Sequence, residues 1–329
     1  MKISEFMPAK QYRYYYQQLS HKDKNVYNKI LSGLLEHNNS IDCSGYSAER
    51  INDIFNMIKY DIPELFYIKA VKVQYACSYI RCTILPEYRF NYHECVNILL
   101  AMENKYRDFI KRVQTLDDVE KEKEIHGLIV SIVEYKNSDA PYSHEAPGTL
   151  LYGIGVCEGI SKAVKYLSDR VGLESIVVTG VSNANDGIEE GHAWNLIKIN
   201  GVFYHLDVTF DATITDNITR FDYFNLSDEE IKTNHLWIDK FPECNRKFDF
   251  YTKNRQFFTG KNDLLQYLKI ESKKSRTIVF QLPFFTTSKE RIIDAIKITV
   301  EEALSDCGLY SVQYYLQYNF DRMIFQLKL

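Results

Sequence analysis

The dipeptide Asn200-Gly201 lies between two runs in which apolar and polar residues alternate, His192–Ile199 and Val202–Val208. An Asn-Gly pair between alternating strands is the strongest short sequence signal for a tight β-hairpin. A two-residue loop fixes the pairing register, and that register makes His192 and Asp207 diagonal neighbours on one face of the ribbon. Their backbones are expected about 7–8 Å apart, within side-chain reach. The sequence therefore predicts a carboxylate that accepts a hydrogen bond from an imidazole and sets its tautomer.

The same register separates His192 from two other polar residues. His205 shares its face but pairs with Leu196, which is about 13 Å along the strand at the usual rise per residue. We expect His205 to have a structural role, or to support the catalytic residues without contacting the substrate. Asp211 is the alternative carboxylate, but it lies where the strand is expected to end, and a cap or turn role is commoner there.

Cys157 is predicted to lie at or just before the start of a helix. The apolar residues that follow it recur at helical spacing as far as Val171, and Gly172 is a suitable stop. A helix N-terminus favours a thiolate, and its backbone N–H groups can face a developing oxyanion. A lone cysteine is more often a small buried hydrophobe.

The histidine and the aspartate change this assessment of the cysteine. A thiol, an imidazole and a carboxylate suit nucleophilic catalysis, in which Cys157 attacks, His192 moves the proton and Asp207 orients the imidazole. A zinc site built from the same three residues is the alternative, although catalytic zinc sites usually have a pair of ligands on one element.

Composition limits the class of protein and its surroundings. The chain has 329 residues, of which 45% are hydrophobic, so about two domains with a full core are expected. A net charge of −4 argues against a nucleic-acid partner. Many of the 25 Tyr and 19 Phe residues lie in strand-like runs, where sheet packing explains them, and a carbohydrate or peptide surface is the alternative.

The seven cysteines are scattered, with no CxxC pair, so neither a zinc framework nor a disulfide scaffold is expected. An odd number of thiols fits a reducing compartment. The residues after Met1 contain no long apolar segment, and none in the chain reaches membrane-spanning length. These features predict a cytoplasmic protein without a membrane span. The alternative is a secreted protein whose signal peptide has been removed.

We expect an α+β protein in three parts: an N-terminal α+β domain over 1–115, a catalytic domain over 116–245 and a small module over 246–329. The last of these has the element order αβαββ. Helical spacing covers 20–59 and 92–135, and two strands are expected between 65 and 90. The segment 137–155 is rich in Ser, Pro and Gly and is predicted to be a loop.

Three motifs resemble those of the transglutaminase-like superfamily, and flanking segments resemble its bacterial branch. The motifs are GVCEG at 155–159, GHAWN at 191–195 and FYHLDVT at 203–209; the flanks are IHGLIV at 125–130, YFNLSDEE at 223–230 and HLW at 235–237. The resemblance covers about 120–240, and a weaker one includes DIPELF at 61–66. It implies a papain-like core in which a helix bearing Cys157 packs on an antiparallel sheet bearing His192 and Asp207. One departure is Val208-Thr209-Phe210, where relatives commonly have a Thr-Trp pair.

By that resemblance the protein is a transglutaminase-like cysteine protease, amidase or acyltransferase. Its thiolate attacks a peptide or protein amide, and the thioester is captured by water or by an amine, with hydrolysis favoured over cross-linking. No calcium loop is recognisable, and no cofactor or metal is expected. The alternative from another class is a non-catalytic module that has kept the fold and binds a peptide or a glycan. The sequence does not indicate an oligomeric state.

Substrate contacts are predicted in the segment before the nucleophile. Tyr142, His144 and Tyr152 are the candidates for substrate binding and for a second oxyanion donor. Trp194 is expected on the same face as His192, where it forms an aromatic wall beside the thiol or packs in the core. We therefore expect the acyl-donor groove between the loop 137–154 and the hairpin that carries His192 and Asp207.

Overall fold

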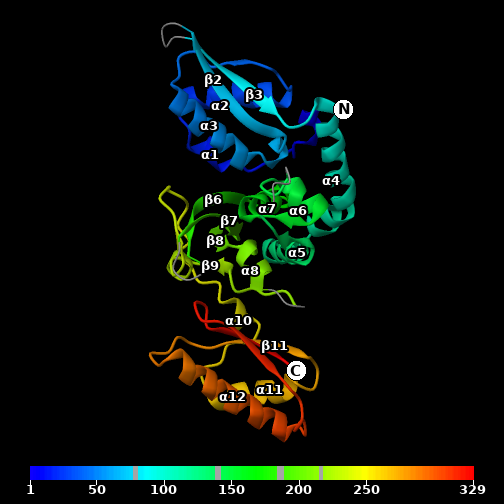
Figure 1. Ribbon diagram of the computed structural model, residues 1–329, viewed down its shortest axis with the longest axis vertical. Helices are drawn as coiled ribbons and strands as arrows, with labels where there is room; N and C mark the ends of the chain where they lie inside the picture. The colour runs from blue at the N-terminus through cyan, green and yellow to red at the C-terminus, as the bar shows by residue number, and fades with distance from the viewer. Residues whose placement is uncertain (77–80, 138–141, 184–188, 215–217) are drawn as a thin grey trace.

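A computed structural model describes residues 1–76, 81–137, 142–183, 189–214 and 218–329. Cys77, one of the seven cysteines, and Pro141, in the segment predicted to be a loop, lie outside these residues. The chain forms three tiers along its long axis, with the N-terminal helices and sheet at one end, a central sheet with its helices, and the C-terminal elements at the other end (Figure 1). Helices and antiparallel sheets are mixed throughout, so the predicted α+β class is confirmed. Among the described helices, none is both long enough and apolar enough to cross a membrane.

The first tier packs helices against a three-stranded antiparallel sheet. The helices begin where serine or asparagine side chains cap them, at Ser20, Ser47 and Asn91. A 3-10 turn, Pro63–Leu65, ends the last helix before the sheet. The elements are η1 (Ile3–Phe6), α1 (Tyr14–Gln18), α2 (His21–Leu35), α3 (Ala48–Asp61) and η2 (Pro63–Leu65), with strands in the order β1 (Ile41–Asp42), β3 (Arg81–Tyr88) and β2 (Ile68–Ala76). Helix α4 (Tyr92–Val113) then runs from this tier along the side of the second, where it packs on helices α6 (Ala146–Tyr152) and α7 (Cys157–Val171) (Figure 1).

The second tier is a five-stranded antiparallel sheet on which helix α7 packs. The strands run in the order β10 (His235–Leu236), β6 (Ser175–Ser182), β7 (Glu190–Ile199), β8 (Val202–Leu206) and β9 (Phe224–Leu226). The helices are α5 (Asp118–Ile132), α6 (Ala146–Tyr152), α7 (Cys157–Val171), α8 (Val208–Ile214) and α9 (Asp228–Ile231). Strand β4 (Glu134–Tyr135) pairs in parallel with β5 (Ile154–Gly155), which immediately precedes α7.

The hairpin predicted at Asn200-Gly201 is present in the expected register. Both residues have positive φ, 49° and 84°, as a type I′ turn requires. Strands β7 and β8 pair from Ile199 with Val202 as far as Asn195 with Leu206.

The prediction that strand β8 continues to Val208 is wrong, because the strand ends at Leu206 and α8 begins at Val208. Asp207 accounts for the change, since its Oδ1 accepts hydrogen bonds from the backbone N–H groups of Thr209 (2.9 Å) and Phe210 (3.1 Å). Such bonds satisfy the free donors of a first helical turn, as an N-terminal cap does.

The segment predicted as a loop before the nucleophile contains a helix, α6. Pro147 lies in its first turn, and Gly153 ends it with a φ of 68°. Proline at a helix start and glycine just after its end are both favourable, so these residues are start and stop signals as well as loop formers. The loop prediction is therefore wrong for Ala146–Tyr152, which are helical, and for Ile154–Gly155, which form β5.

The third tier contains the predicted αβαββ order, preceded by the short helix α10 (Phe250–Lys253). Its sheet has the order β11, β13, β12; the elements are α11 (Lys261–Glu271), β11 (Thr277–Gln281), α12 (Lys289–Asp306), β12 (Tyr315–Asn319) and β13 (Ile324–Lys328). One buried apolar cluster takes in side chains from Ile3 to Phe248, and a second runs from Leu264 to Leu327. The division into domains at 115/116 and 245/246 stays a proposal.

Candidate active site

Cys157 is the first residue of α7 and is only partly exposed. Two hydrogen bonds position this end of the helix. The N–H of Val156 donates to the Ser143 carbonyl at 2.9 Å, and the Asn195 side chain on β7 donates to the Ser161 carbonyl on α7 at 3.1 Å. The helix that carries the thiol is therefore tied both to the preceding segment and to the strand that carries His192.

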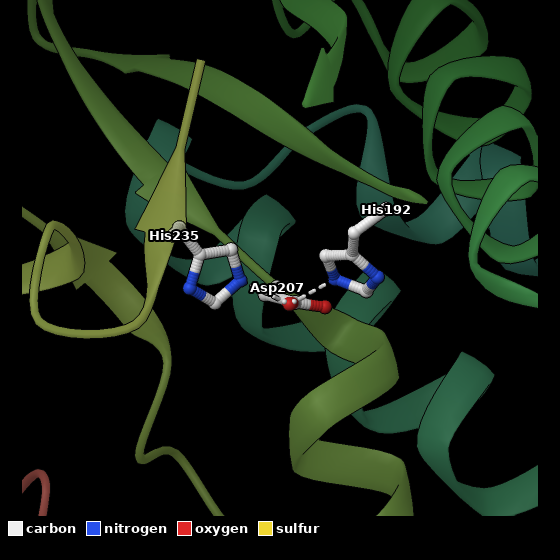
Figure 2. A group of neighbouring side chains, drawn as sticks. All are labelled: His192, Asp207 and His235. Atoms are coloured by element: carbon white, nitrogen blue, oxygen red, sulfur yellow. Dashed lines mark hydrogen bonds and ion pairs between the residues drawn. The ribbon is translucent and has the colours of Figure 1, made fainter. Parts of the chain in front are cut away.

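His192 and Asp207 form a close, buried pair (Figure 2). The Nε2 of His192 donates to Oδ2 of Asp207 at 2.7 Å, and the two residues are 8% and 0% exposed. Because Nε2 is occupied by the carboxylate, Nδ1 is the ring nitrogen left for the Cys157 thiol, which lies close enough to contribute to the pKa of this imidazole. The three residues that the sequence predicted as a triad are thus brought together.

The electrostatics of the pair favour an imidazolium beside a carboxylate. Burial alone lowers the pKa of His192, but the charge and hydrogen bond of Asp207, together with Cys157, outweigh burial and raise the pKa to about 10. Burial raises the pKa of Asp207, yet its contacts with His192 and then His235 bring that pKa well below its ordinary value.

A second imidazole, that of His235, was not singled out from the sequence. Its Nε2 lies 2.9 Å from the same Oδ2 of Asp207, and its side chain is fully buried. His235 lies on the edge strand β10, which pairs with β6, so the sheet brings it to Asp207 from a distant segment (Figure 2). Only the HLW stretch at 235–237 in the sequence resemblance pointed to this region.

Two groups among the described residues have the spacing of metal ligands: His192 with Asp207 and His235, and His205 with Asp228 and Cys244. In the first group, both rings direct Nε2 at the carboxylate, as two hydrogen-bond donors do. These hydrogen bonds account for the first arrangement.

In the second group, Trp194 Nε1 donates to His205 Nδ1 at 2.9 Å, which places the ring proton on Nε2, 2.7 Å from Asp228. A protonated nitrogen cannot ligate a metal, and burial raises the pKa of the Cys244 thiol, with a further contribution from Asp228. Hydrogen bonds account for this arrangement as well.

The two rival residues of the sequence analysis have other partners. His205 pairs with Leu196 as predicted and bonds Trp194 and Asp228. Asp211 is fully buried, and its Oδ2 lies 2.8 Å from Nε2 of His126 rather than beside His192.

A cleft of about 580 Å³ opens at His192. Tyr135 lies on its wall, placed there by the pairing of β4 with β5, and burial followed by the nearby Cys157 raises the pKa of its hydroxyl. The C-terminal sheet also contributes to the lining, through the end of β12 and the turn that follows it. The residues lining the cleft are Tyr135, Ser182, Glu190, Gly191, His192, Thr209, Phe210, Thr213, Ile214, Tyr223, Asn234, Lys289, Tyr318, Asn319, Phe320 and Asp321.

The predicted substrate contacts lie outside this cleft. Tyr142 stacks on Phe90, with ring centroids 5.3 Å apart, and its ring also lies 4.8 Å from that of the half-exposed Tyr152. His144 is exposed and lies 3.4 Å from Glu158. A role for these residues in binding substrate stays a prediction.

Trp194 is 1% exposed and stacks on His192, with ring centroids 5.9 Å apart. Trp194 therefore packs in the core and does not form a wall of the cleft. Its ring supports the imidazole of His192.

A buried cluster of charges adjoins Cys157. Lys162 on α7 is 1% exposed, and its Nζ lies 2.8 Å from Glu145 and 2.7 Å from Glu158. The same ammonium donates to the His144 carbonyl at 3.3 Å. The cluster therefore attaches the segment before α6 to the first turn of α7.

Gly159 gives a testable measure of how closely that segment packs on α7. A Cβ at this position would lie 2.4 Å from the carbonyl oxygen of Ser143 and 3.1 Å from the amide nitrogen of Glu145. We expect Gly159→Ala to lower the free energy of unfolding by about 2–3 kcal/mol, because the backbone must move apart. Gly127 in α5 is the matched control: a Cβ there would meet no neighbouring atom within 4 Å, so Gly127→Ala should raise that free energy by about 0.5–1 kcal/mol. Urea unfolding measures both, and equal effects of the two substitutions would contradict the close contact.

The central part of the chain is similar to a known protein family. A family model described as the transglutaminase-like superfamily matches residues 107–208. No curated protein sequence matches the chain. Among solved structures, a proposed cysteine protease from Cytophaga hutchinsonii matches at 15% identity with a TM-score of 0.29, over 43% of this chain and 62% of that one. A structure described as a TGase matches at 14% identity with a TM-score of 0.29, over 46% of each chain.

The chain thus spans less than two thirds of the length of either solved structure. The segment that the family model matches contains Cys157, His192 and Asp207. Residues 107–208 of the chain are therefore similar to the transglutaminase-like superfamily.

Proposed function

We propose that this protein is a cysteine-dependent acyl-transfer enzyme that acts on amide bonds of peptides or proteins. Cys157 is the nucleophile, His192 the general base and acid, and Asp207 the residue that orients the imidazole. The observation that carries the proposal is the buried 2.7 Å hydrogen bond from His192 Nε2 to Asp207, which leaves Nδ1 for the thiol at the start of α7.

In this mechanism, the Cys157 thiolate attacks the amide carbonyl carbon and the carbonyl oxygen takes up the negative charge. As the tetrahedral species collapses, the carbon–nitrogen bond breaks and the leaving amine receives the proton of the His192 imidazolium. His192 then removes a proton from water, the resulting hydroxide attacks the thioester, and the carbon–sulfur bond breaks to give the acid and the thiolate.

We propose water as the usual acceptor. Hydrolysis needs only that His192 reach a water molecule in the cleft, whereas cross-linking also needs a site that binds an amine and keeps water out. The cleft at His192 gives water access to the imidazole that would remove its proton.

Alkylation by iodoacetamide at pH 7 tests the nucleophile without a known substrate. Cys43, Cys82, Cys95 and Cys244 are buried and should react slowly for that reason alone, so Cys307, which is also partly exposed, is the matched comparison. We expect Cys157 to react about tenfold faster than Cys307, because an imidazolium beside it favours the thiolate. His192→Ala should abolish the difference. Equal rates of Cys157 and Cys307 in the wild type would contradict the proposal.

Products distinguish the chemical outcomes. Incubation with a peptide-amide library and methylamine, followed by mass spectrometry, should give mainly hydrolysed products that are absent with Cys157→Ala. Mainly methylamide products would make the enzyme a transamidase. Equal binding of peptides by the wild type and Cys157→Ala, with no product from either, would favour a binding module.

A further inference from the structure

A continuous series of hydrogen bonds connects the C-terminal sheet to His192. Asp207 Oδ2 lies 2.7 Å from His192 Nε2 and 2.9 Å from His235 Nε2. His235 Nδ1 lies 2.7 Å from Oδ1 of Asn234, and Nδ2 of Asn234 donates to Oδ2 of Asp321 at 3.1 Å. Asp321 belongs to the turn between β12 and β13. The series therefore starts in the C-terminal sheet and ends at His192 on β7, in the central sheet.

The partners fix the direction of each bond. Asn234 must present its amide nitrogen to Asp321, because a carboxylate only accepts, and its oxygen therefore faces His235. His235 then donates from Nδ1 to that oxygen and from Nε2 to the Asp207 carboxylate. Both ring nitrogens of His235 thus face hydrogen-bond acceptors.

These bonds leave Asp207 with a single orientation. Its Oδ1 accepts from the N–H groups of Thr209 and Phe210, and its Oδ2 accepts from the two imidazoles. Without His235, the carboxylate could turn about its own bond, and its charge would be concentrated on His192. Both changes would disturb the imidazole that faces the thiol.

We propose that His235 is a positioning residue for the Asp207–His192 pair, and that Asn234 and Asp321 make the C-terminal sheet part of the same apparatus. The inference rests on the proposed function. His235 is fully buried and is not among the residues that line the cleft, so it acts on the reaction through Asp207 and not by touching substrate.

Two amide substitutions test the role of each ring nitrogen. Glutamine places its nitrogen near the position of Nε2 and can still donate to Asp207, whereas asparagine places it near Nδ1 and can donate only to Asn234. We expect His235→Asn to slow iodoacetamide alkylation of Cys157 on the order of 10- to 100-fold, and His235→Gln to retain the rate within a few fold. For any peptide amide turned over, His235→Asn should lower kcat and leave KM unchanged. Equal rates for the two variants would overturn the role of Nε2.

The exposed end of the series can be tested without disturbing the core. Asp321→Ala removes the carboxylate that orients Asn234 and should slow alkylation several-fold. In the double variant Asp321→Ala/His235→Asn, the rate should equal that of His235→Asn alone, because both changes break one series. Additive losses would overturn the coupling.

His192→Ala separates the two proposals. If it leaves alkylation of Cys157 unchanged, the proposed triad itself fails. If it slows alkylation while His235→Asn does not, only the positioning inference fails. Thermal melting of each variant verifies that the protein is folded.

Discussion

Replacing Asp207 with asparagine should lower the rate of acyl transfer by roughly 10³- to 10⁴-fold, as the equivalent change does in serine proteases. Four hydrogen-bond donors surround this carboxylate, two from the backbone and two from imidazoles. In the asparagine variant, the side-chain NH₂ group would therefore face hydrogen-bond donors in either orientation of the amide. If it faces His192, the ring has to present a lone pair at Nε2 and a proton at Nδ1, and it can no longer accept a proton from the thiol.

The pH dependence should change as well. Asp207 is the main contact that raises the pKa of His192, whereas burial lowers it. Without the negative charge, burial dominates, so His192 loses its proton at lower pH and the alkaline limit of acyl transfer should shift downward, because the leaving amine needs that proton. Rates measured from pH 5 to 10 test this direction.

Asp211→Asn is the matched control. Asp211 is also fully buried, accepts two backbone N–H groups and contacts an imidazole, but that imidazole is His126. We expect Asp211→Asn to lower the free energy of unfolding without the large loss of acyl-transfer rate that Asp207→Asn causes. An Asp207→Asn variant that retains more than a tenth of the wild-type rate would contradict the assigned role.

The second large effect is expected for Lys162→Met, at about 3–5 kcal/mol of lost folding free energy. The substitution leaves Glu145, which is 3% exposed, and Glu158 without their close cation. Arg89 and Lys59 remain, each 3.8 Å from one of these carboxylates, and are too distant to replace Lys162 fully. Burial alone raises the pKa of Glu158, and Lys162, with Lys59, outweighs it and lowers that pKa to about 2.

Lys29→Met provides the comparison for this prediction. Lys29 also lies within a helix and contacts a carboxylate at 2.6 Å, but that pair with Asp42 is more than half exposed. Removing an exposed pair should cost less than about 1 kcal/mol. Chemical unfolding of both variants measures the difference, and similar losses would show that burial of the Lys162 cluster contributes little.

The sequence predicted those features that depend on neighbouring residues. The Asn200-Gly201 turn specifies the register of its own two strands, and that register was sufficient to bring His192 near Asp207. Helical spacing and Gly172 were sufficient to place Cys157 at a helix start. Each of these features is encoded within a short segment.

Features that depend on distant pairing could not be predicted in this way. His235 reaches Asp207 because β10 pairs with β6 at the edge of the sheet, and Tyr135 reaches the cleft because β4 pairs with β5. Neither pairing involves a turn that specifies its register. The start of α8 was missed for another reason: Asp207 serves both as a partner of His192 and as a helix cap, and the alternation of the strand indicates only the first role.

The order of the site residues along the chain has a consequence for biosynthesis. Cys157 precedes His192, Asp207 and His235, and each of these three residues is placed by an element completed later in translation. On the proposed mechanism, a nascent chain that exposes Cys157 would carry an unactivated thiol. Its reactivity would arise only when β7, the start of α8 and β10 have come together, so an incompletely folded chain could not modify its neighbours.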